Sequence, residues 1–201
     1  VEGGPKNSVN FLYYCNSIIN QADPPQAAES LLRAGVYWPG AGISDISSVQ
    51  EEWKENAPVV PLVFYRALVQ GAGLNPINRM VRALLREEIN PLPIFVASLK
   101  DPISVATLDQ LFQSTDPDAI LNCTSFAVGN PHGDGNPDNP LTLPSACKAP
   151  VLQVVLSAST EQDWEKGLNG LSARDIAMNV ALPEVDGRIL SRAVSFKGEA
   201  F

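Results

Sequence analysis

Two carboxylates, Glu184 and Asp186, stand on a short turn near the end of the 201-residue chain. Pro183 precedes them and Gly187 closes the turn, so the backbone can present both acids at one edge of the molecule. Carboxylates placed in this way can bind a metal ion or remove a proton from a substrate. A solvated surface turn explains the pair equally well. The elements around the turn are therefore needed to distinguish a functional site from an ordinary surface turn.

The elements before this turn indicate a buried unit. Val151–Leu156 is an unbroken apolar run, which is typical of a strand buried on both faces. Thr160 and Ser172 each stand three residues before an aspartate, and both are expected to cap helices. The second of these helices is expected to end at Leu182-Pro183, because Pro183 has no amide with which to continue it.

Strands and helices alternate from residue 57 onward. Helices are expected to begin at Asn75-Pro76 and Asp101-Pro102, and Arg188–Phe196 is a last extended segment. The expected buried strands are Val59–Tyr65, Leu92–Ala97, Ala119–Cys123 and Val151–Leu156. This alternation predicts an α/β fold: a parallel, flavodoxin-like or Rossmann-like sheet of about four strands with helices on both faces.

The first quarter of the chain has a different pattern. Helices are expected over Val9–Ile19, Pro25–Arg33 and Ser44–Asn56. A sheet strand is expected there only if Val36–Trp38 pairs with another strand. We therefore divide the chain into a mainly helical N-terminal segment, residues 1–56, and an α/β three-layer domain, residues 57–201.

Polar residues follow the expected strands. Ligands of parallel α/β sheets bind outside the carboxyl ends of the strands. Tyr65-Arg66, Ser98, Thr124-Ser125 and Ser157–Ser159 stand at these ends. We expect a site at this edge of the sheet, with the two acids of the 184–186 turn near the same rim. Arg66 suits an anionic ligand group, and an ordinary ion pair is the equally weighted alternative.

The composition excludes several classes of function. There are 14 Lys and Arg residues against 22 Asp and Glu residues, a net charge of −8, which argues against nucleic acid or an anionic membrane as the main partner. No stretch approaches the roughly 20 apolar residues of a membrane span. Gly71-Ala72-Gly73 is an incomplete nucleotide-binding pattern. Cys15, Cys123 and Cys147 have no disulfide or metal spacing, so we expect reduced cysteines in the cytoplasm, with Cys123 buried.

Residues 129–144 are rich in Gly, Pro, Asn and Asp and include His132, Asp134 and Asp138. These residues do not have the spacing of an EF-hand. No G-x-S-x-G motif accompanies His132, so a serine hydrolase is set aside. We expect a solvated, expanded loop.

Four stretches resemble the family of large chelatase subunits, which contains the CobN subunit of cobaltochelatase and the H subunit of magnesium chelatase. The stretches are Leu31–Gly40, Val60–Asp101, Pro150–Ser157 and Ser172–Ile189. The most specific part is ALPEVDG, from Ala181 to Gly187, and the resemblance is closer to the cobalt branch.

This resemblance implies an internal fragment of a very large cytoplasmic subunit. The implied reaction is ATP-dependent insertion of Co²⁺ into a tetrapyrrole, hydrogenobyrinic acid a,c-diamide, in cobalamin biosynthesis; insertion of Mg²⁺ into protoporphyrin IX is the runner-up. Separate AAA+ subunits would hydrolyse ATP, which is not bound here. The partners are thus the tetrapyrrole, the AAA+ subunits and the other domains of the subunit. The enzyme class is a ligase that forms nitrogen–metal bonds, and the fragment alone is expected to be inactive.

The resemblance also implies roles for the candidate residues. Glu184 corresponds to the family's Glu in the LPE stretch and is the first choice as proton acceptor or metal escort, with Asp186 second. Arg66 corresponds to the family's Arg after the same strand and would meet a ring carboxylate.

Other side chains at the strand ends are candidates for binding the substrate. Tyr65, Ser125 and Ser159 are the expected contacts. Tyr37, Trp38 and Tyr65 are aromatic residues that can stack on a macrocycle, although core packing is the favoured role for them.

Two alternatives stay open. One is a non-catalytic scaffold domain of the same subunit, which an exposed apolar patch without a pocket would favour. The other is a flavodoxin-like small-molecule binding module, which a deep cleft at the strand ends, with Glu184 pointing away from it, would favour.

Overall fold

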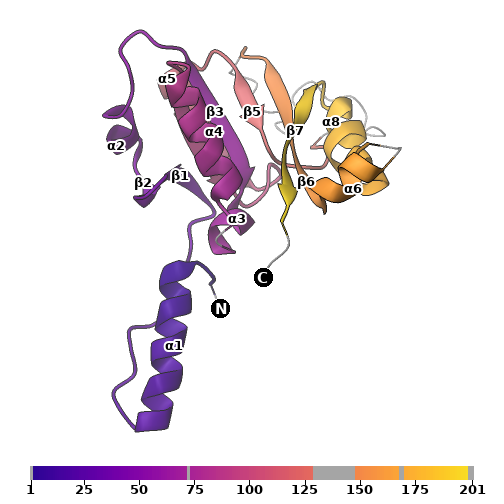
Figure 1. Cartoon of the computed structure of the whole chain (residues 1–201). Helices are drawn as coiled ribbons and strands as arrows, with labels where there is room; N and C mark the ends of the chain where they lie inside the picture. Colours follow the sequence, from indigo (N-terminus) through magenta and orange to yellow (C-terminus); the bar gives the residue numbers. More distant parts are fainter. Residues whose placement is uncertain (1, 72, 129–147, 168–169, 199–201) are drawn as a thin grey trace.

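The computed structural model describes residues 2–71, 73–128, 148–167 and 170–198, in which seven strands form one sheet with helices packed against it (Figure 1). The strands are β1 Ala34–Trp38, β2 Gly42–Ser44, β3 Val59–Tyr65, β4 Asn90–Val96, β5 Ile120–Asn122, β6 Val151–Thr160 and β7 Ile189–Lys197. The helices are α1 Pro5–Asn20, α2 Ile46–Gln50, α3 Arg66–Gln70, α4 Asn75–Arg86, α5 Pro102–Thr115, α6 Glu161–Lys166, α7 Ala173–Ile176, the π-helical turn η1 Ala177–Ala181, and α8 Leu182–Val185.

The strand order is β2-β1-β4-β3-β5-β6-β7. The strands from β3 to β7 are mutually parallel, whereas β1 runs antiparallel to both β4 and β2. The expected α/β class with a mainly parallel sheet is confirmed, but about four strands is too few. The sheet gains three strands: β1, which pairs with a strand distant in sequence (Ala34 opposite Val96), β2, which pairs with β1, and β7, whose residues are mostly exposed.

Helices cover both faces of the sheet because its central strands are apolar on both sides. On one face, Leu62 and Phe64 of β3 pack in a core that includes Ile77 and Val81 of α4. On the other face, Val63 packs in a core that includes residues of α5. Successive side chains of a strand point to opposite faces, so one buried strand supports both layers. All five residues from Val60 to Phe64 are buried.

The first quarter of the chain differs from its predicted helices. The helix expected over Val9–Ile19 is present as α1, which projects away from the sheet (Figure 1). The helix expected over Pro25–Arg33 is absent. The Asn7 side chain donates to the Glu29 carbonyl at 2.8 Å and accepts from the Glu29 amide at 3.0 Å, so neither backbone group is left for a helical hydrogen bond. α2 ends at Gln50, well before Asn56. Val36–Trp38 does pair with other strands: it belongs to β1, which joins the main sheet together with β2.

Most of the expected helix caps are confirmed. The carboxylate of Asp101 accepts from the Ser104 amide at 2.9 Å, and Thr160 and Ser172 cap α6 and α7 in the same way. Asn75 is instead the first residue of its helix and caps nothing. The short helix α3 follows β3 directly and begins at Arg66.

Pro183 does not end the helix that precedes it. The chain passes from α7 through η1 into α8, which contains Pro183 in its first turn. The Leu182 amide donates to the carbonyl of Ala177, five residues earlier. This wider turn gives the proline ring room that a regular α-helix would deny it.

No helix within the described ranges is long and apolar enough to cross a membrane.

Candidate functional site

A cavity of about 370 Å³ lies at the carboxyl ends of β3, β4 and β5. Its lining residues are Tyr65, Ser98, Leu99, Lys100, Ser125, Phe126, Ala127, Val128 and Leu182. Among the parallel strands, β4 follows β3 on one side and β5 lies on its other side, so the sheet reverses its winding here. Such a switch point is where α/β sheets bind ligands. The cavity therefore coincides with the edge at which the sequence predicts a site.

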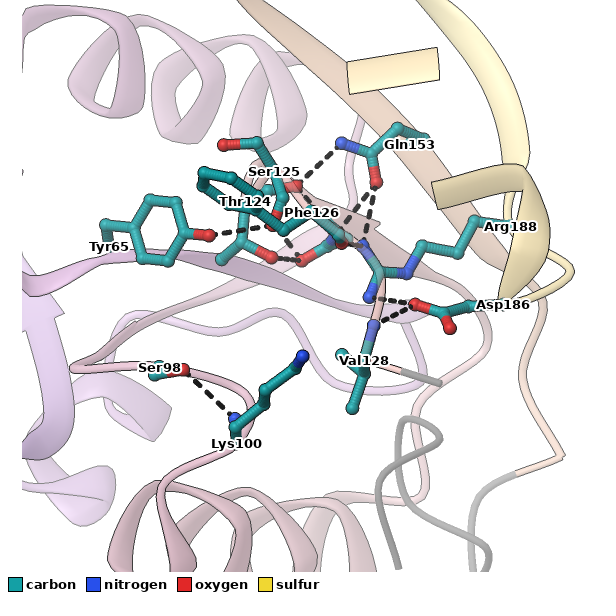
Figure 2. A network of polar contacts seen from close by, with 11 residues as sticks. Tyr65, Ser98, Lys100, Thr124, Ser125, Phe126, Val128, Gln153, Asp186 and Arg188 are labelled. Carbon is teal, nitrogen blue, oxygen red and sulfur yellow. Dashed lines mark hydrogen bonds and ion pairs between the residues drawn. The ribbon is translucent and has the colours of Figure 1, made fainter. Parts of the chain in front are cut away.

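The Tyr65 hydroxyl donates to the Ser125 carbonyl oxygen at 2.7 Å across one wall of the cavity (Figure 2). Burial raises the pKa of the Tyr65 phenol, and the hydrogen bonds around Ser125 only partly offset this rise. The phenol is therefore protonated at neutral pH and acts as a donor. On another side, the Ser98 hydroxyl accepts from the Lys100 amide at 3.1 Å, and the exposed Lys100 side chain supplies a positive charge.

Phe126 has an unusual backbone for a large side chain. Its φ of 70° lies in the left-handed region, which costs a non-glycine residue about 1–3 kcal/mol. Its amide donates to the Met178 carbonyl at 3.0 Å, and its own carbonyl accepts from Arg188 at 3.3 Å. Phe126 is nevertheless 51% exposed. The fold thus holds an aromatic face at the cavity against a local conformational cost.

A buried ion pair fixes the wall that carries Phe126. Nη2 of Arg188 lies 2.7 Å from Oδ2 of Asp186, and their side chains are 2% and 3% exposed (Figure 2). The same carboxylate oxygen accepts from the Val128 amide at 2.7 Å. Burial lowers the pKa of the Arg188 guanidinium, and the Asp186 charge opposes that shift. The turn after Pro183 therefore positions residues 126–128.

Buried amides continue this network beneath the cavity. Asn122 donates to the Gln153 side-chain oxygen at 2.8 Å, and Gln153 donates to the Thr124 carbonyl at 2.8 Å. The Thr124 hydroxyl in turn donates to Asn122 at 2.8 Å. Arg188 reaches the Gln153 oxygen at 3.4 Å. Buried polar groups that satisfy one another in this way make the end of β5 rigid.

A second polar cluster surrounds Asp175, which is 1% exposed. Its carboxylate accepts from the Ser157 and Ser172 hydroxyls at 2.7 and 3.1 Å, from the Ala158 amide at 3.0 Å and from the Ser159 hydroxyl at 3.3 Å. Burial alone would raise the pKa of Asp175, but these hydrogen bonds outweigh burial and the pKa is lowered. The cluster ties α7 to the end of β6.

The structure brings only part of the predicted site together. Tyr65 and Ser125 line the cavity as a bonded pair. Ser159 is engaged by Asp175, and Arg66 begins α3 and donates to the Leu31 carbonyl at 3.3 Å. None of the lining residues of the cavity is Ser159 or Arg66.

The two acids of the 184–186 turn occupy different environments. Asp186 is buried in its ion pair with Arg188, whereas Glu184 is exposed on α8. Glu184 stands two residues after Leu182, which lines the cavity. Tyr37 belongs to the core: its hydroxyl donates to Asn78 at 2.9 Å and its ring meets Phe64 edge-on at 6.2 Å.

The sequence alone did not single out four residues of the candidate site and its surroundings: Phe126 and Lys100, which line the cavity, and Arg188 and Asp175, which are buried in polar contacts. Phe126 and Lys100 follow strand-end serines by one and two residues, which is the one local signal that points to them. Asp175 was expected only as the partner of a helix cap. Arg188 was expected as the start of an extended segment, and nothing in its neighbours indicates burial.

The described part of the chain contains no group of three or more His, Cys, Asp and Glu side chains that could hold a metal ion. Glu184, the predicted metal contact, is therefore not part of a metal-binding cluster among the described residues. The loop with His132 lies outside the described residues, as does Cys147. Burial raises the pKa of the Cys123 thiol to about 12, as expected for a buried and unreactive cysteine.

Known proteins of similar sequence identify the family of this chain. The CobN subunit of aerobic cobaltochelatase from Sinorhizobium sp. is 46% identical over 98% of this chain and 16% of its own length. The corresponding subunit from Pseudomonas aeruginosa is 34% identical over 100% of this chain and 16% of its own length. The chain thus spans about a sixth of the length of these relatives.

The fold agrees with a solved structure. The catalytic subunit of cobaltochelatase from Mycobacterium tuberculosis aligns with a TM-score of 0.73 and 24% identity, over 99% of this chain and 16% of that one. A profile of the family described as CobN/Magnesium Chelatase matches residues 1–200. The chain therefore belongs to the CobN/Magnesium Chelatase family.

Proposed function

We propose that the chain is a piece of the large subunit of a cytoplasmic, ATP-dependent chelatase that inserts Co²⁺ into hydrogenobyrinic acid a,c-diamide in cobalamin biosynthesis. The relatives at 46% and 34% identity are both cobaltochelatase subunits, which favours cobalt over the runner-up, Mg²⁺ into protoporphyrin IX. AAA+ subunits hydrolyse the ATP in this proposal. Metal and tetrapyrrole are both substrates, joined by nitrogen–metal bonds.

The switch-point cavity is the part of this chain that contacts the macrocycle. The observation that supports this role best is the half-exposed ring of Phe126, held on a left-handed backbone beside the cavity. Strained residues of this kind cluster at binding sites, and a flat ring is the natural ligand of an aromatic face. A volume of about 370 Å³ is at the low end for ligand pockets, so an edge of the macrocycle enters it.

Lys100 and Tyr65 would hold the polar side groups of the macrocycle. The Lys100 ammonium can pair with a ring carboxylate, and the Tyr65 hydroxyl can donate to a ring amide or carboxylate in place of the Ser125 carbonyl. Arg188 and Asp186 keep the wall with Phe126 and Val128 in position. In this assignment Asp186 is a positioning residue.

Replacing Phe126 with glycine tests the cavity. Glycine relieves the left-handed backbone, so the free energy of unfolding should stay equal or rise by about 1 kcal/mol. Loss of the aromatic face should weaken binding of the corrin precursor about tenfold, since an aromatic contact and its buried area contribute about 1.4 kcal/mol. Quenching of tryptophan fluorescence measures binding, and urea denaturation measures stability.

The matched control is Phe11→Ala, which removes an exposed aromatic side chain from α1, a helix that contributes nothing to the cavity lining. This variant should bind like the unmodified chain. Equal affinity of Phe126→Gly and the unmodified chain would remove Phe126 from the site. Saturable binding of protoporphyrin in place of the corrin precursor would favour the magnesium branch.

Glu184 is the proposed proton acceptor, because a ring nitrogen loses its proton when the metal enters. Its exposure on α8 leaves the carboxylate accessible to a bound macrocycle and to an arriving metal ion. Glu184→Gln in the complete subunit should retain macrocycle binding and lower the insertion rate about 100-fold or more. Absorbance of the metallated ring follows insertion, and Glu165→Gln, also exposed, is the control. An unchanged insertion rate in Glu184→Gln would refute the role.

A scaffold domain without catalysis is the second candidate. The observation that favours it is the apolar surface of α1, where large side chains are 57–79% exposed. These side chains are Phe11, Leu12, Tyr13, Ile18 and Ile19. A surface of this kind docks against another protein layer. Absence of binding of either tetrapyrrole to this chain, together with normal insertion by the Phe126 and Glu184 variants, would favour the scaffold.

A further inference from the structure

The outer face of α4 carries three arginines, Arg79, Arg82 and Arg86, which are all exposed. Together with Leu85 they line a shallow hollow of about 580 Å³, and we refer to these four residues as the arginine face. Residues three and four apart are neighbours on a helix, so the three guanidinium groups lie along one stripe. At 1.5 Å per residue, the stripe is about 10 Å long.

The guanidinium groups of this face have no carboxylate partner among the described residues. The four ion pairs among the described residues have Lys6, Arg33, Lys54 and Arg188 as their cations. Glu88, just beyond the end of α4, is paired with Lys54 at 2.6 Å. Like charges three or four residues apart destabilise a helix. The chain as a whole has a net charge of −8, yet these three arginines have no carboxylate partner among the described residues. We therefore expect an anionic partner outside these residues.

The arginine face is separate from the switch-point cavity. α4 begins after the carboxyl end of β3 and runs back to the amino end of β4, so Arg82 and Arg86 lie progressively farther from the strand ends that form the cavity. The opposite side of the helix, with Ile77 and Val81, is buried in the core. The inward side packs α4 against the sheet, so the outward side is not needed for folding and can bind a partner.

We propose that the arginine face is the docking surface for an acidic polypeptide segment of another protein or domain. Arginine binds carboxylates through two parallel hydrogen bonds, and Leu85 adds an apolar contact between the charges. A stripe of about 10 Å matches carboxylates spaced three and four residues apart on a partner helix. The net charge of −8 disfavours nucleic acid and anionic membranes, whose charge extends far beyond this face. This inference does not depend on the chelatase reaction.

The test uses the 201-residue chain and a fluorescein-labelled, 20-residue helical peptide with Glu at three positions, spaced by three and four residues. Fluorescence anisotropy at low salt should show saturable binding to the unmodified chain. The variant Arg79→Gln/Arg82→Gln/Arg86→Gln should bind at least tenfold more weakly, because the charge-assisted hydrogen bonds are lost. Its urea midpoint should be equal or higher, because repulsion along α4 is removed.

The control variant Lys166→Gln/Arg174→Gln/Arg192→Gln removes three exposed positive charges from other elements and should bind the peptide within twofold of the unmodified chain. A peptide with Gln at the three Glu positions should not bind. The proposal is overturned if the unmodified chain does not bind the Glu peptide, if both triple variants weaken binding equally, or if the Gln peptide binds as well as the Glu peptide. Tighter binding of heparin or of phosphatidylserine vesicles than of the peptide would also overturn it.

Discussion

Replacing Arg188 with methionine is expected to lower the free energy of unfolding by about 3–5 kcal/mol, as found when one partner of a buried ion pair is removed. The Asp186 carboxylate, whose side chain is 3% exposed in the unmodified chain, would lose its cationic partner and keep the hydrogen bond from the Val128 amide. The carbonyl of Phe126 and the side-chain oxygen of Gln153 would also lose a donor. Urea denaturation followed by tryptophan fluorescence measures the change.

The companion variant separates charge burial from simple loss of contacts. Arg188→Met combined with Asp186→Leu should recover at least half of the lost stability, because an apolar pair of similar volume often replaces a buried ion pair without net cost. Arg192→Met, at an exposed position of β7, should change stability by less than about 0.5 kcal/mol. A loss below about 1 kcal/mol in Arg188→Met would show that this ion pair does not hold the cavity wall.

Asp175→Asn is expected to lower the free energy of unfolding by about 2–4 kcal/mol at neutral pH. The aspartate accepts hydrogen bonds from two serine hydroxyls and one amide within 3.1 Å, and hydrogen bonds to a charged group contribute about 1.5–3 kcal/mol each. The amide group of asparagine would place its own donors against these donors. Asp23→Asn, at an exposed position, is the control and should be neutral.

The same variant should change how stability depends on pH. The pKa of Asp175 is lower in the folded chain than the value of about 3.9 of an unfolded aspartate, so the folded state favours the charged form. Its contribution is complete above about pH 4 and is lost as the pH falls through the folded pKa. The stability difference between Asp175→Asn and the unmodified chain should therefore shrink below about pH 4. A difference that stays constant down to the acid limit of folding would contradict this assignment.

Local patterns in the sequence predict most of the central fold. The apolar run of β3 and the Asp101 cap depend on residues next to one another, and both are present where expected. The missed features depend on partners distant in sequence. β1 forms because Ala34 pairs opposite Val96, and Pro25–Arg33 is not helical because the Asn7 side chain hydrogen-bonds the backbone of Glu29. Periodicity within a short window contains no information about such partners.

The candidate site is predictable in place but not in detail. The alternation of strands and helices locates the cavity at the strand ends, and Tyr65 and Ser125 line it. The positive φ of Phe126 depends on bonds to Met178 and Arg188, which come from another part of the chain. Glu184 and Asp186 look alike in sequence, but Asp186 is buried in an ion pair with Arg188 and Glu184 is exposed.

The position of β7 at the end of the strand order has a consequence for the behaviour of the isolated chain in solution. Its outer edge has no paired strand among the described residues, and its exposed side chains include Ile189 at 55% and Leu190 at 48%. An unpaired, partly apolar edge is a template on which another extended chain can add. Self-association of concentrated samples should therefore begin at β7, by growth of the sheet from one molecule into the next.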